Sequence, residues 1–300
     1  MFTLEGKTAV ITGAGNGLGF EYAKSMAALG ATVGINDLGG TFSGEGADAG
    51  AAGKAVKAIE AAGGVAFANA GDVTSEKDAE EMINQAFDRT GHLDILVCNA
   101  GILRDSMVFN MDPKDWDAVV NVHLRGHFLP LHYASKKWRE NFKKTNEAKP
   151  ASVILTSSRS GLYSNAGQLS YAAAKAGIAS MAMVLARELG KYGVRTNAIA
   201  PIAKTRMTES SFGKIDAGKW DPANVAPMVS FLASDEASDI NGQVFVVGGG
   251  QIEWMRGWTP QGAIDSAGGT LSPERIVELK GDLFGDGATS PEAYPTAQWA

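Results

Sequence analysis

Cysteine is almost absent from this chain. Its 300 residues contain only Cys98, so no internal disulfide can form. Cys98 lies in an apolar run, and we expect a buried thiol without a chemical role. No 18 consecutive residues are apolar, so we expect no transmembrane helix. The N-terminus lacks the segments of a signal peptide, and residues 298–300 are no peroxisomal address. These absences favour a cytoplasmic protein with no membrane partner.

Positive charge is also scarce. The formal net charge is −6, so we expect no nucleic-acid partner. Hydrophobic residues make up 45% and charged residues 20% of the chain, which is ordinary for a globular protein with a large core. A chain of this length could hold one large α/β domain or two smaller ones.

Glycines are frequent where the chain first turns. The apolar run 8–11 leads into Thr12-Gly13-Ala14-Gly15-Asn16-Gly17-Leu18-Gly19, and a helical pattern follows to Leu29. Glycines permit a tight turn and a close approach of backbone N–H groups to a ligand. The positive end of the following helix favours an anion, typically a pyrophosphate in a βαβ unit. A glycine-rich turn that only packs the helix on the strand is the alternative.

The end of the next apolar run argues for a dinucleotide. Residues 32–36 lead to Asp37, 18 residues after Gly19, and an acid at about this distance binds a ribose 2′-hydroxyl. The carboxylate would repel the 2′-phosphate of NADP, and no lysine or arginine stands in the turn or directly after Asp37 to attract one. The sequence therefore predicts NAD as the cofactor.

Short apolar runs alternate with longer helical patterns, which is typical of a parallel sheet covered by helices. We expect strands at residues 8–11, 32–36, 65–70, 93–98, 153–156, 194–200 and 243–247. We expect helices at residues 18–29, 51–62, 76–90, 113–138 (bent at Pro130), 171–192 and 225–233. We expect the insertion 39–53 to form a surface loop at the adenine end of the cofactor, and residues 202–221 to form a mobile loop with small helical pieces.

The texture changes in the last 50 residues. Periodicity is weak, Gly and Pro are common, and Trp254, Trp258 and Trp299 occur there. We therefore predict one domain over residues 1–250 and an irregular C-terminal extension over residues 251–300. Its tryptophans suggest that it packs on its own domain or on a neighbouring subunit, and a partly ordered tail is the alternative.

Tyr171 and Lys175 are four residues apart at the start of an expected helix, so both side chains lie on one face. A nearby cation lowers the pKa of a phenol, and a phenolate can take a proton from an alcohol while hydride leaves its carbon. Ser158 follows an expected strand at the edge where ligands gather, and its hydroxyl could hold the substrate oxygen. A chance pair on a solvated helix and a capping serine are the alternatives, with Ser157 and Ser160 as rivals to Ser158.

The sequence resembles the short-chain dehydrogenases/reductases over about residues 3–250. The motifs that match occur in the order typical of that family, and they are Thr12-Gly13 with Gly17 and Gly19, Asp72-Val73, Asn99-Ala100-Gly101, Ser158, Tyr171 with Lys175, and Pro201. The resemblance implies an NAD-binding Rossmann-type fold, a doubly wound parallel sheet of seven strands in the order 3-2-1-4-5-6-7. It implies that Tyr171 is the acid/base, that Lys175 binds the nicotinamide ribose and lowers the Tyr171 pKa, and that Ser158 positions the substrate. The implied cofactor contacts are Gly13, Asn16, Gly17, Leu18, Gly19, Asp37, Asp72, Val73, Asn99, Ala100, Gly101, Tyr171, Lys175, Pro201, Ile202 and Thr205.

A narrower likeness concerns residues 36–40, 101–105, 122–126 and 200–207. They resemble the dehydrogenase part of the peroxisomal multifunctional enzymes type 2, also described as 17β-hydroxysteroid dehydrogenase type 4. This resemblance implies oxidation by NAD of a (3R)-hydroxyacyl-CoA, including one with a steroid or bulky acyl part, with a 17β-hydroxysteroid alone as the alternative substrate. A 3-oxoacyl reductase is disfavoured because Asp37 opposes NADPH. The resemblance also implies a homodimer or homotetramer, assembled through helices around 113–138 and 171–192.

Two positions depart from the family pattern. His123 stands in His123-Leu124-Arg125-Gly126 where the family has a catalytic asparagine, and we interpret it as a member of the proton relay. Pro201-Ile202 replaces the family's Pro-Gly, and Thr205 comes one residue earlier than usual. This second departure lies in the loop that contacts the nicotinamide amide and phosphate.

Two further hypotheses were weighed. His123 and His127 are one helical turn apart, but no acidic third ligand accompanies them, so we expect no metal site. A non-catalytic NAD-binding sensor or scaffold could have the same fold. The combination of Ser158, Tyr171 and Lys175 argues against it.

Overall fold

The computed structural model describes residues 2–48, 50–205, 207–208, 218–265, 270–285, 287 and 290. Its contacts divide the chain into two units, Met1–Met255 and Arg256–Ala300. The first unit contains the sheet and every residue of the predicted site. In the described part of the second unit, two short helices form, α10 (Pro273–Glu278) and α11 (Lys280–Phe284).

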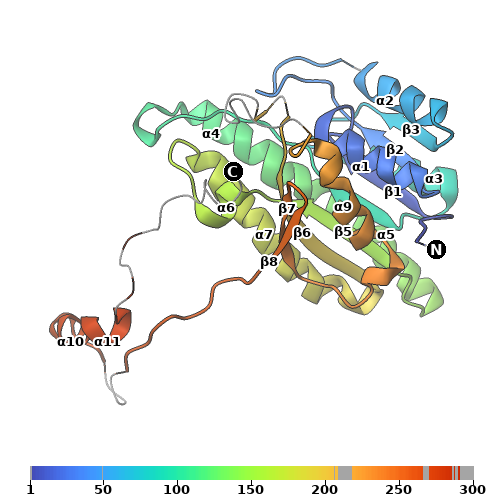
Figure 1. The fold of residues 1–300 in the computed structure, drawn as a ribbon. Helices are drawn as coiled ribbons and strands as arrows, with labels where there is room; N and C mark the ends of the chain where they lie inside the picture. Colours follow the sequence, from blue (N-terminus) through green and yellow to red (C-terminus); the bar gives the residue numbers. More distant parts are fainter. Residues whose placement is uncertain are drawn as a thin grey trace. The chain divides into compact units, whose positions relative to one another are not determined.

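The first unit is built on an eight-stranded sheet with the order β3-β2-β1-β4-β5-β6-β7-β8 (Figure 1). Its strands are β1 Thr8–Thr12, β2 Thr32–Asn36, β3 Val65–Asn69, β4 Ile95–Cys98, β5 Ala151–Thr156, β6 Val194–Ile202, β7 Val244–Gly248 and β8 Gln251–Met255. The first seven are parallel, and their order confirms the topology implied by the family resemblance. The expected number of strands was one too low.

The eighth strand corrects the prediction that the chain becomes irregular after residue 250. β8 runs antiparallel to β7, from Gly248 opposite Gln251 to Val244 opposite Met255. The two-residue loop between them is Gly249-Gly250, with φ of 55° and 78°. Positive φ at both positions gives a turn whose twist matches that of a hairpin, and glycine adopts it without strain. The two glycines that we placed at the end of a strand therefore reverse the direction of the chain and lead into β8.

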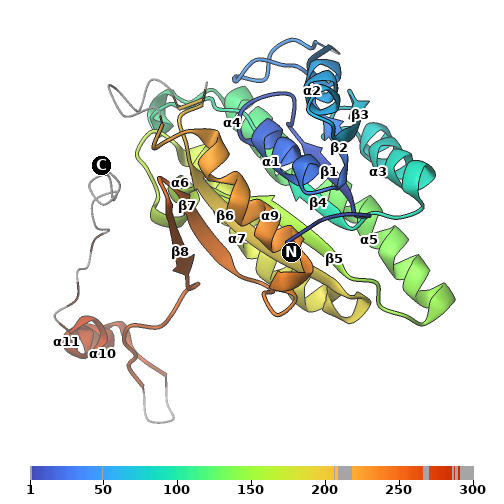
Figure 2. The ribbon, with the colours of Figure 1, turned by 45° about the vertical axis from the view of Figure 1, so that its right-hand side comes forward.

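Helices cover both faces of the sheet (Figure 2). They are α1 Gly17–Ala28, α2 Gly50–Ala61, α3 Glu76–Thr90, α4 Pro113–Val120, α5 Gly126–Thr145, α6 Arg159–Tyr163, α7 Leu169–Leu189 and α9 Ala226–Ala233. Local signals set several of their ends. Ser75 Oγ accepts from the Asp78 N–H at 3.3 Å and caps α3, and Gly91 ends that helix in the left-handed conformation. Asp112 caps α4, whose first residue is Pro113.

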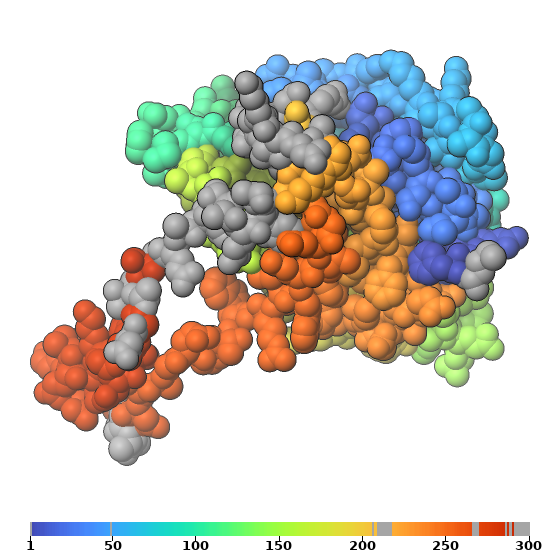
Figure 3. Space-filling model, viewed as in Figure 1, coloured from blue at the N-terminus to red at the C-terminus, as the bar shows by residue number. Residues whose placement is uncertain are grey.

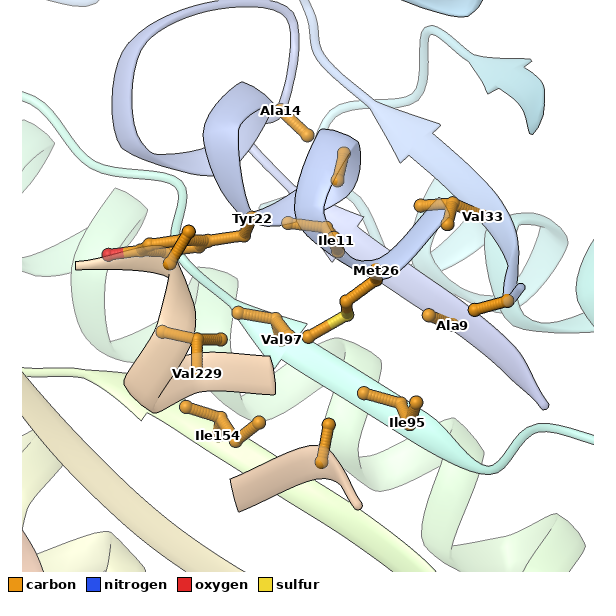
Figure 4. Close-up of a cluster of buried hydrophobic side chains, with 14 of the residues drawn as sticks. Ala9, Ile11, Ala14, Tyr22, Met26, Val33, Ile95, Val97, Ile154 and Val229 are labelled. Atoms are coloured by element: carbon orange, nitrogen blue, oxygen red, sulfur yellow. The ribbon is translucent and has the colours of Figure 1, made fainter. Parts of the chain in front are cut away.

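A hydrophobic core lies between the sheet and the helices on each of its two faces. One packs α1, α2 and α9 against the sheet, and Figure 4 shows it around Tyr22, Met26, Ile95 and Val229. α1 and α9 lie side by side (blue and orange in Figure 3), and a 2.8 Å hydrogen bond joins Ser25 Oγ to Ser230 Oγ. The other core packs α3, α5 and α7 on the opposite face. Cys98 is fully buried in this second core, and burial raises the pKa of its thiol.

The expected long helix 113–138 contains a π-helical segment, Asn121–Arg125, between α4 and α5. Its extra residue per turn rotates the following side chains relative to an unbroken α-helix. The helix continues through Pro130, which lies inside α5, where we expected a bend. The π segment contains His123, so this irregularity lies at a predicted site residue.

β6 continues through Pro201 to Ile202, although we expected it to end at Ala200. β5 ends at Thr156, which pairs with Ile199, and beyond that point β6 pairs only with β7. A proline without an N–H is tolerated on a strand that has lost its neighbour on one side. Half of the predicted loop 202–221, residues 206 and 209–217, lies outside the described residues.

One described segment, Leu169–Tyr192, is long and apolar enough to cross a membrane by length and composition, with a mean hydropathy of 1.4. It comprises α7 and the turn after it. Core helices of globular domains meet the same criterion, and α7 packs against β5, β6 and the π segment. The apolar composition of α7 is therefore weak evidence for a membrane span.

Candidate active site

A cavity of about 540 Å³ lies at the carboxyl ends of the central strands. Parallel α/β sheets bind their ligands at this edge. The predicted site residues that line it are Gly13, Asn16, Gly17, Leu18, Asp37, Asp72, Val73, Asn99, Ala100, Gly101, His123, Ser158, Tyr171, Lys175, Pro201 and Thr205. Gly19 and Ile202 are the predicted contacts that do not line it. The structure thus gathers almost all of the predicted site from distant parts of the chain.

The glycine turn after β1 has the shape that a phosphate site needs. Gly13 has a φ of 63° and Gly17 a φ of 56°, both in the left-handed region. The residue before α1, Asn16, makes no side-chain cap, so no side chain of that residue occupies the first helical N–H groups. Gly19 has a packing role, because a Cβ there would collide with the Gly13 carbonyl oxygen.

Asp37 borders the cavity just beyond β2. Its Oδ2 accepts from the Gly15 N–H and its Oδ1 from the Gly39 N–H, both at 2.7 Å. These bonds hold the carboxylate beside the glycine turn, where a ribose attached to the pyrophosphate would lie. The alternative of a turn that only packs helix on strand does not explain an acid held at this point.

Asn99 supports the same turn from the next strand. Its Nδ2 donates to the carbonyls of Thr12 and Gly13, both at 3.1 Å, and its N–H donates to Thr12 Oγ1 at 2.9 Å. Asp72 lies on the other side of the cavity, where its Oδ1 accepts from the N–H and hydroxyl of Thr74. Asn99 thus ties β4 to the glycine turn, and the contacts of Asn99 and Asp72 with a bound cofactor stay a prediction.

Lys175 lies at the bottom of the cavity and is 3% exposed. Its Nζ donates to the Thr156 carbonyl at 2.5 Å and is 5.6 Å from the centre of the Tyr171 ring. Burial lowers the pKa of Lys175 to about 7. The pair lies on one face of a core helix over the sheet edge, which excludes the alternative of a chance pair on a solvated face.

Ser158 is distinguished from its two neighbours by its surroundings. The Ser157 hydroxyl is buried and donates to the Lys175 carbonyl at 2.7 Å, and the Ser160 hydroxyl donates to Gln168 Oε1 at 2.6 Å. Ser158 Oγ accepts from the Ser160 N–H at 3.2 Å and faces the cavity. Ser158 does cap α6, as the alternative held, but this bond uses its oxygen and leaves its hydroxyl proton for a ligand.

Comparison with known proteins agrees with this geometry. A family model described as short chain dehydrogenase matches residues 7–215. The chain is 42% identical to hydroxyacyl-CoA dehydrogenase ChsB1 of Mycobacterium tuberculosis, with 94% of this chain and 89% of that protein covered. The chain belongs to the short chain dehydrogenase family. As a dehydrogenase of this family with a Rossmann fold, it uses a nicotinamide dinucleotide cofactor.

Two other relatives extend the comparison. This dehydrogenase is 40% identical to peroxisomal multifunctional enzyme type 2 of Mus musculus over 87% of its own length, and it spans about a third of that protein. The crystal structure of a short chain dehydrogenase from Mycobacterium avium matches with a TM-score of 0.84 and 40% identity, covering 97% of this chain and 98% of that one.

His123 lies directly beside Tyr171 in this dehydrogenase. The two rings meet edge to face with centroids 5.2 Å apart. His123 Nε2 lies 2.8 Å from the Ile102 carbonyl and 3.1 Å from the Ile102 nitrogen, and among the described residues Nδ1 has no hydrogen-bond partner. Burial, aided by the Lys175 charge, holds the His123 pKa well below its ordinary range. A neutral ring beside Tyr171 fits the relay role, which stays a prediction.

The ring of His123 also explains Gly101. A Cβ at Gly101 would collide with the imidazole Cε1, so only glycine leaves room for the histidine. No set of three or more potential ligands among His, Cys, Asp and Glu comes together anywhere in the described residues. The described structure therefore offers no protein site of that kind for a metal at His123 and His127.

Sequence reasoning did not assign the insertion after β2 to the wall of the cavity. Gly40, Thr41, Phe42 and Gly44 line the cavity, and Phe42 is 55% exposed, so the insertion lies at the surface as expected and also forms part of this wall. The Leu103 N–H donates to the Phe42 carbonyl at 3.0 Å, which ties the insertion to the loop after β4. The position directly after Asp37 was the available signal, because a segment following the ribose acid must start at the ligand.

We expect acid to destabilise the fold through His127. This side chain is fully buried, and burial lowers its pKa to about 3, with the Lys175 charge adding to the effect. Between pH 6.5 and 3 the unfolded chain binds a proton that the folded chain does not, so stability falls as the pH falls. The loss from pH 7 to 5 is roughly 2 kcal/mol for this group. Urea unfolding at the two pH values measures it.

His127→Gln should lose less stability than the wild type over this interval. His132→Gln is the matched control, because His132 is a half-exposed histidine on the same helix. If the His127→Gln and wild-type proteins lose the same stability on acidification, His127 is not the acid-sensitive group. His123 acts in the same direction, so some pH dependence should remain in the variant.

Proposed function

We propose that this protein oxidises a (3R)-3-hydroxyacyl-CoA to the 3-oxoacyl-CoA with NAD. The observation that carries this proposal is the convergence of Ser158, Tyr171 and Lys175 beside the Asp37-bordered turn, in one cavity. The substrate class is supported by the relative named hydroxyacyl-CoA dehydrogenase, which matches nearly the whole chain. The matched multifunctional enzyme type 2 supports the same class, although this chain spans only part of it.

The described residues fit a nicotinamide dinucleotide. The left-handed glycines and uncapped α1 suit the pyrophosphate, and Asp37 suits an adenosine ribose that lacks a 2′-phosphate. When bound, the cofactor supplies the hydride acceptor. We therefore propose NAD as the cofactor, since Asp37 would repel the extra phosphate of NADP.

The protein's own groups handle the proton. Ser158 donates a hydrogen bond to the substrate oxygen and fixes its distance from Tyr171. Tyr171, as phenolate, takes the alcohol proton as the C–H hydride leaves, so the product is a ketone. Lys175 stabilises the phenolate through its charge and is oriented by the Thr156 carbonyl. His123 completes the proton path beside Tyr171.

We also propose that the protein is a homodimer or homotetramer formed through α5 and α7. Phe128 on α5 is 49% exposed, and Leu169 and Val184 on α7 are 46% and 47% exposed. Large apolar side chains on neighbouring helices would be covered in such an assembly. Light scattering at several concentrations tests this, and a concentration-independent monomer would contradict it.

The test of function is NAD and NADP reduction with a panel of substrates. The panel contains 3-hydroxyacyl-CoAs of several chain lengths in both configurations and a 17β-hydroxysteroid. We expect turnover of (3R)-thioesters with NAD. Turnover of the steroid alone would move the assignment to a hydroxysteroid dehydrogenase. No turnover of any member, with NAD still bound, would refute the proposed substrate class.

A further inference from the structure

The Gln168 side chain joins three segments next to Ser158. Gln168 precedes α7 but does not cap it with its side chain. Its Nε2 donates to Asp105 Oδ2, in the loop after β4, at 2.7 Å. Its Oε1 accepts from Ser160 Oγ, in α6, at 2.6 Å. One amide therefore connects the β4 loop, α6 and α7.

Ser160, which donates to Gln168, also contacts Ser158. Its side chain is 6% exposed, and its N–H donates to Ser158 Oγ at 3.2 Å. A serine hydroxyl rotates freely unless its oxygen is engaged, so this bond narrows the directions in which the Ser158 hydroxyl proton can point. The position of Ser160, and with it the orientation of Ser158, depends on the Gln168 oxygen.

Asp105 gives the amide its orientation. A carboxylate can only accept, so it selects the amide face that donates and turns the carbonyl toward Ser160. Burial raises the pKa of Asp105, and the bond from Gln168 acts against this rise. The Ser106 N–H also donates to the Gly167 carbonyl at 2.8 Å, so the backbones of the two loops lie side by side.

We propose that Gln168 is a positioning residue for the dehydrogenase reaction, which orients Ser158 through Ser160 and is itself oriented by Asp105. The inference rests on the role proposed for Ser158. An amide suits this position because it donates to Asp105 and accepts from Ser160 at the same time. Neither a carboxylate nor an apolar side chain can do both.

Replacing the Gln168 amide with a carboxylate beside Asp105 provides the test. Gln168→Glu places two carboxyl groups together, and they can hold the arrangement only when one of them is protonated. We expect kcat at pH 8 to fall roughly tenfold or more, since a misplacement of this kind disturbs the reacting geometry, and to recover toward pH 6. NAD affinity should stay at the wild-type value, because Gln168 does not line the cavity.

The double variant Asp105→Asn with Gln168→Glu should restore kcat at pH 8. The amide introduced at position 105 donates to the carboxylate introduced at position 168, and that carboxylate still accepts from the Ser160 hydroxyl. The same hydrogen bonds are then formed, with the negative charge at position 168 and no longer at position 105. Asn165→Ala is the matched control. Asn165 Nδ2 also donates to Gln168 Oε1, at 3.2 Å, but it is exposed and leads to no site residue.

Other charged and ionisable groups near this network set the background of the pH profile. They are Arg104, which is paired with Asp115 at 2.8 Å, Arg159 and Tyr163 of α6, and Tyr171 of α7. All are present in every variant, so a pH profile that changes only in Gln168→Glu reports on the new pair. The melting temperature of each variant is measured across the same pH range.

The outcomes separate this inference from the proposed function. Turnover of the steroid in place of the thioesters would refute the proposed substrate, and the same variant ratios would then be measured with the steroid. An unchanged kcat in Gln168→Glu at pH 8 overturns the positioning role. So does a double variant that regains the wild-type melting temperature without regaining kcat.

Discussion

Tyr171→Phe should lose about a thousandfold in kcat, because general acid–base catalysis contributes roughly 10² to 10⁴ in rate. The substitution removes the phenol oxygen and keeps the ring. The substitution therefore preserves the packing of this ring against the His123 ring, whose centroid is 5.2 Å away, and against Lys175 Nζ, which is 5.6 Å from the ring centroid. Turnover is measured with saturating NAD and substrate.

Two controls make this prediction specific. NAD binding, followed by protein fluorescence, should stay at the wild-type level, which separates a catalytic defect from a collapsed cavity. Tyr192→Phe removes a phenol whose ring packs on Phe142, outside the cavity, and should leave turnover unchanged. A Tyr171→Phe protein that keeps most of its activity would show that another group accepts the proton.

Asp37→Ser should change cofactor selectivity by about 100-fold or more. The NAD complex loses charge-assisted hydrogen bonds to the ribose, each worth about 1.5–3 kcal/mol, and the NADP complex loses a repulsion. Each 1.4 kcal/mol changes the ratio about tenfold. The measured quantity is the ratio of kcat/KM for NAD to that for NADP with one substrate.

Glu45→Ser is the matched control for this substitution. It removes one negative charge from the insertion that follows Asp37, but Glu45 does not line the cavity. The selectivity of Glu45→Ser should therefore stay near the wild-type ratio. Since Asp37 also accepts from Gly15 and Gly39, the melting temperature of Asp37→Ser is needed alongside. An unchanged ratio in a folded Asp37→Ser protein would refute the assignment of NAD selectivity to this carboxylate.

The fold was predictable because its signals are local. Alternating apolar runs and helical patterns gave the parallel strands, and caps such as Ser75 and Asp112 marked helix starts. β8 was missed because it is a strand of five residues at the edge of the sheet, and three of its residues are exposed. The Gly249-Gly250 pair was a usable hairpin signal that we interpreted as a strand end.

The site was predictable where motif spacing is sufficient. Gly13 and Asp37 directly follow strands, and Tyr171 and Lys175 lie one helical turn apart in the first part of α7, so these four positions follow from distances along the chain. The π segment at His123 was not predictable, since it depends on how α4 and α5 meet the sheet and α7. The wall formed by Phe42 depends likewise on a contact with the distant loop after β4.

The sequence by itself therefore determined the alternation of parallel strands and helices, the turn for a dinucleotide and the helical spacing of Tyr171 and Lys175, whereas the order of the strands was implied by the family resemblance. Only the tertiary structure decided which of the three serines keeps its hydroxyl proton for a ligand at the cavity, and that Gln168 bridges Asp105 to Ser160. It also decided that His127 is buried and neutral. The physical reason is that spacing is a property of one segment, whereas burial, charge state and hydrogen-bond partners come from segments far apart in the chain.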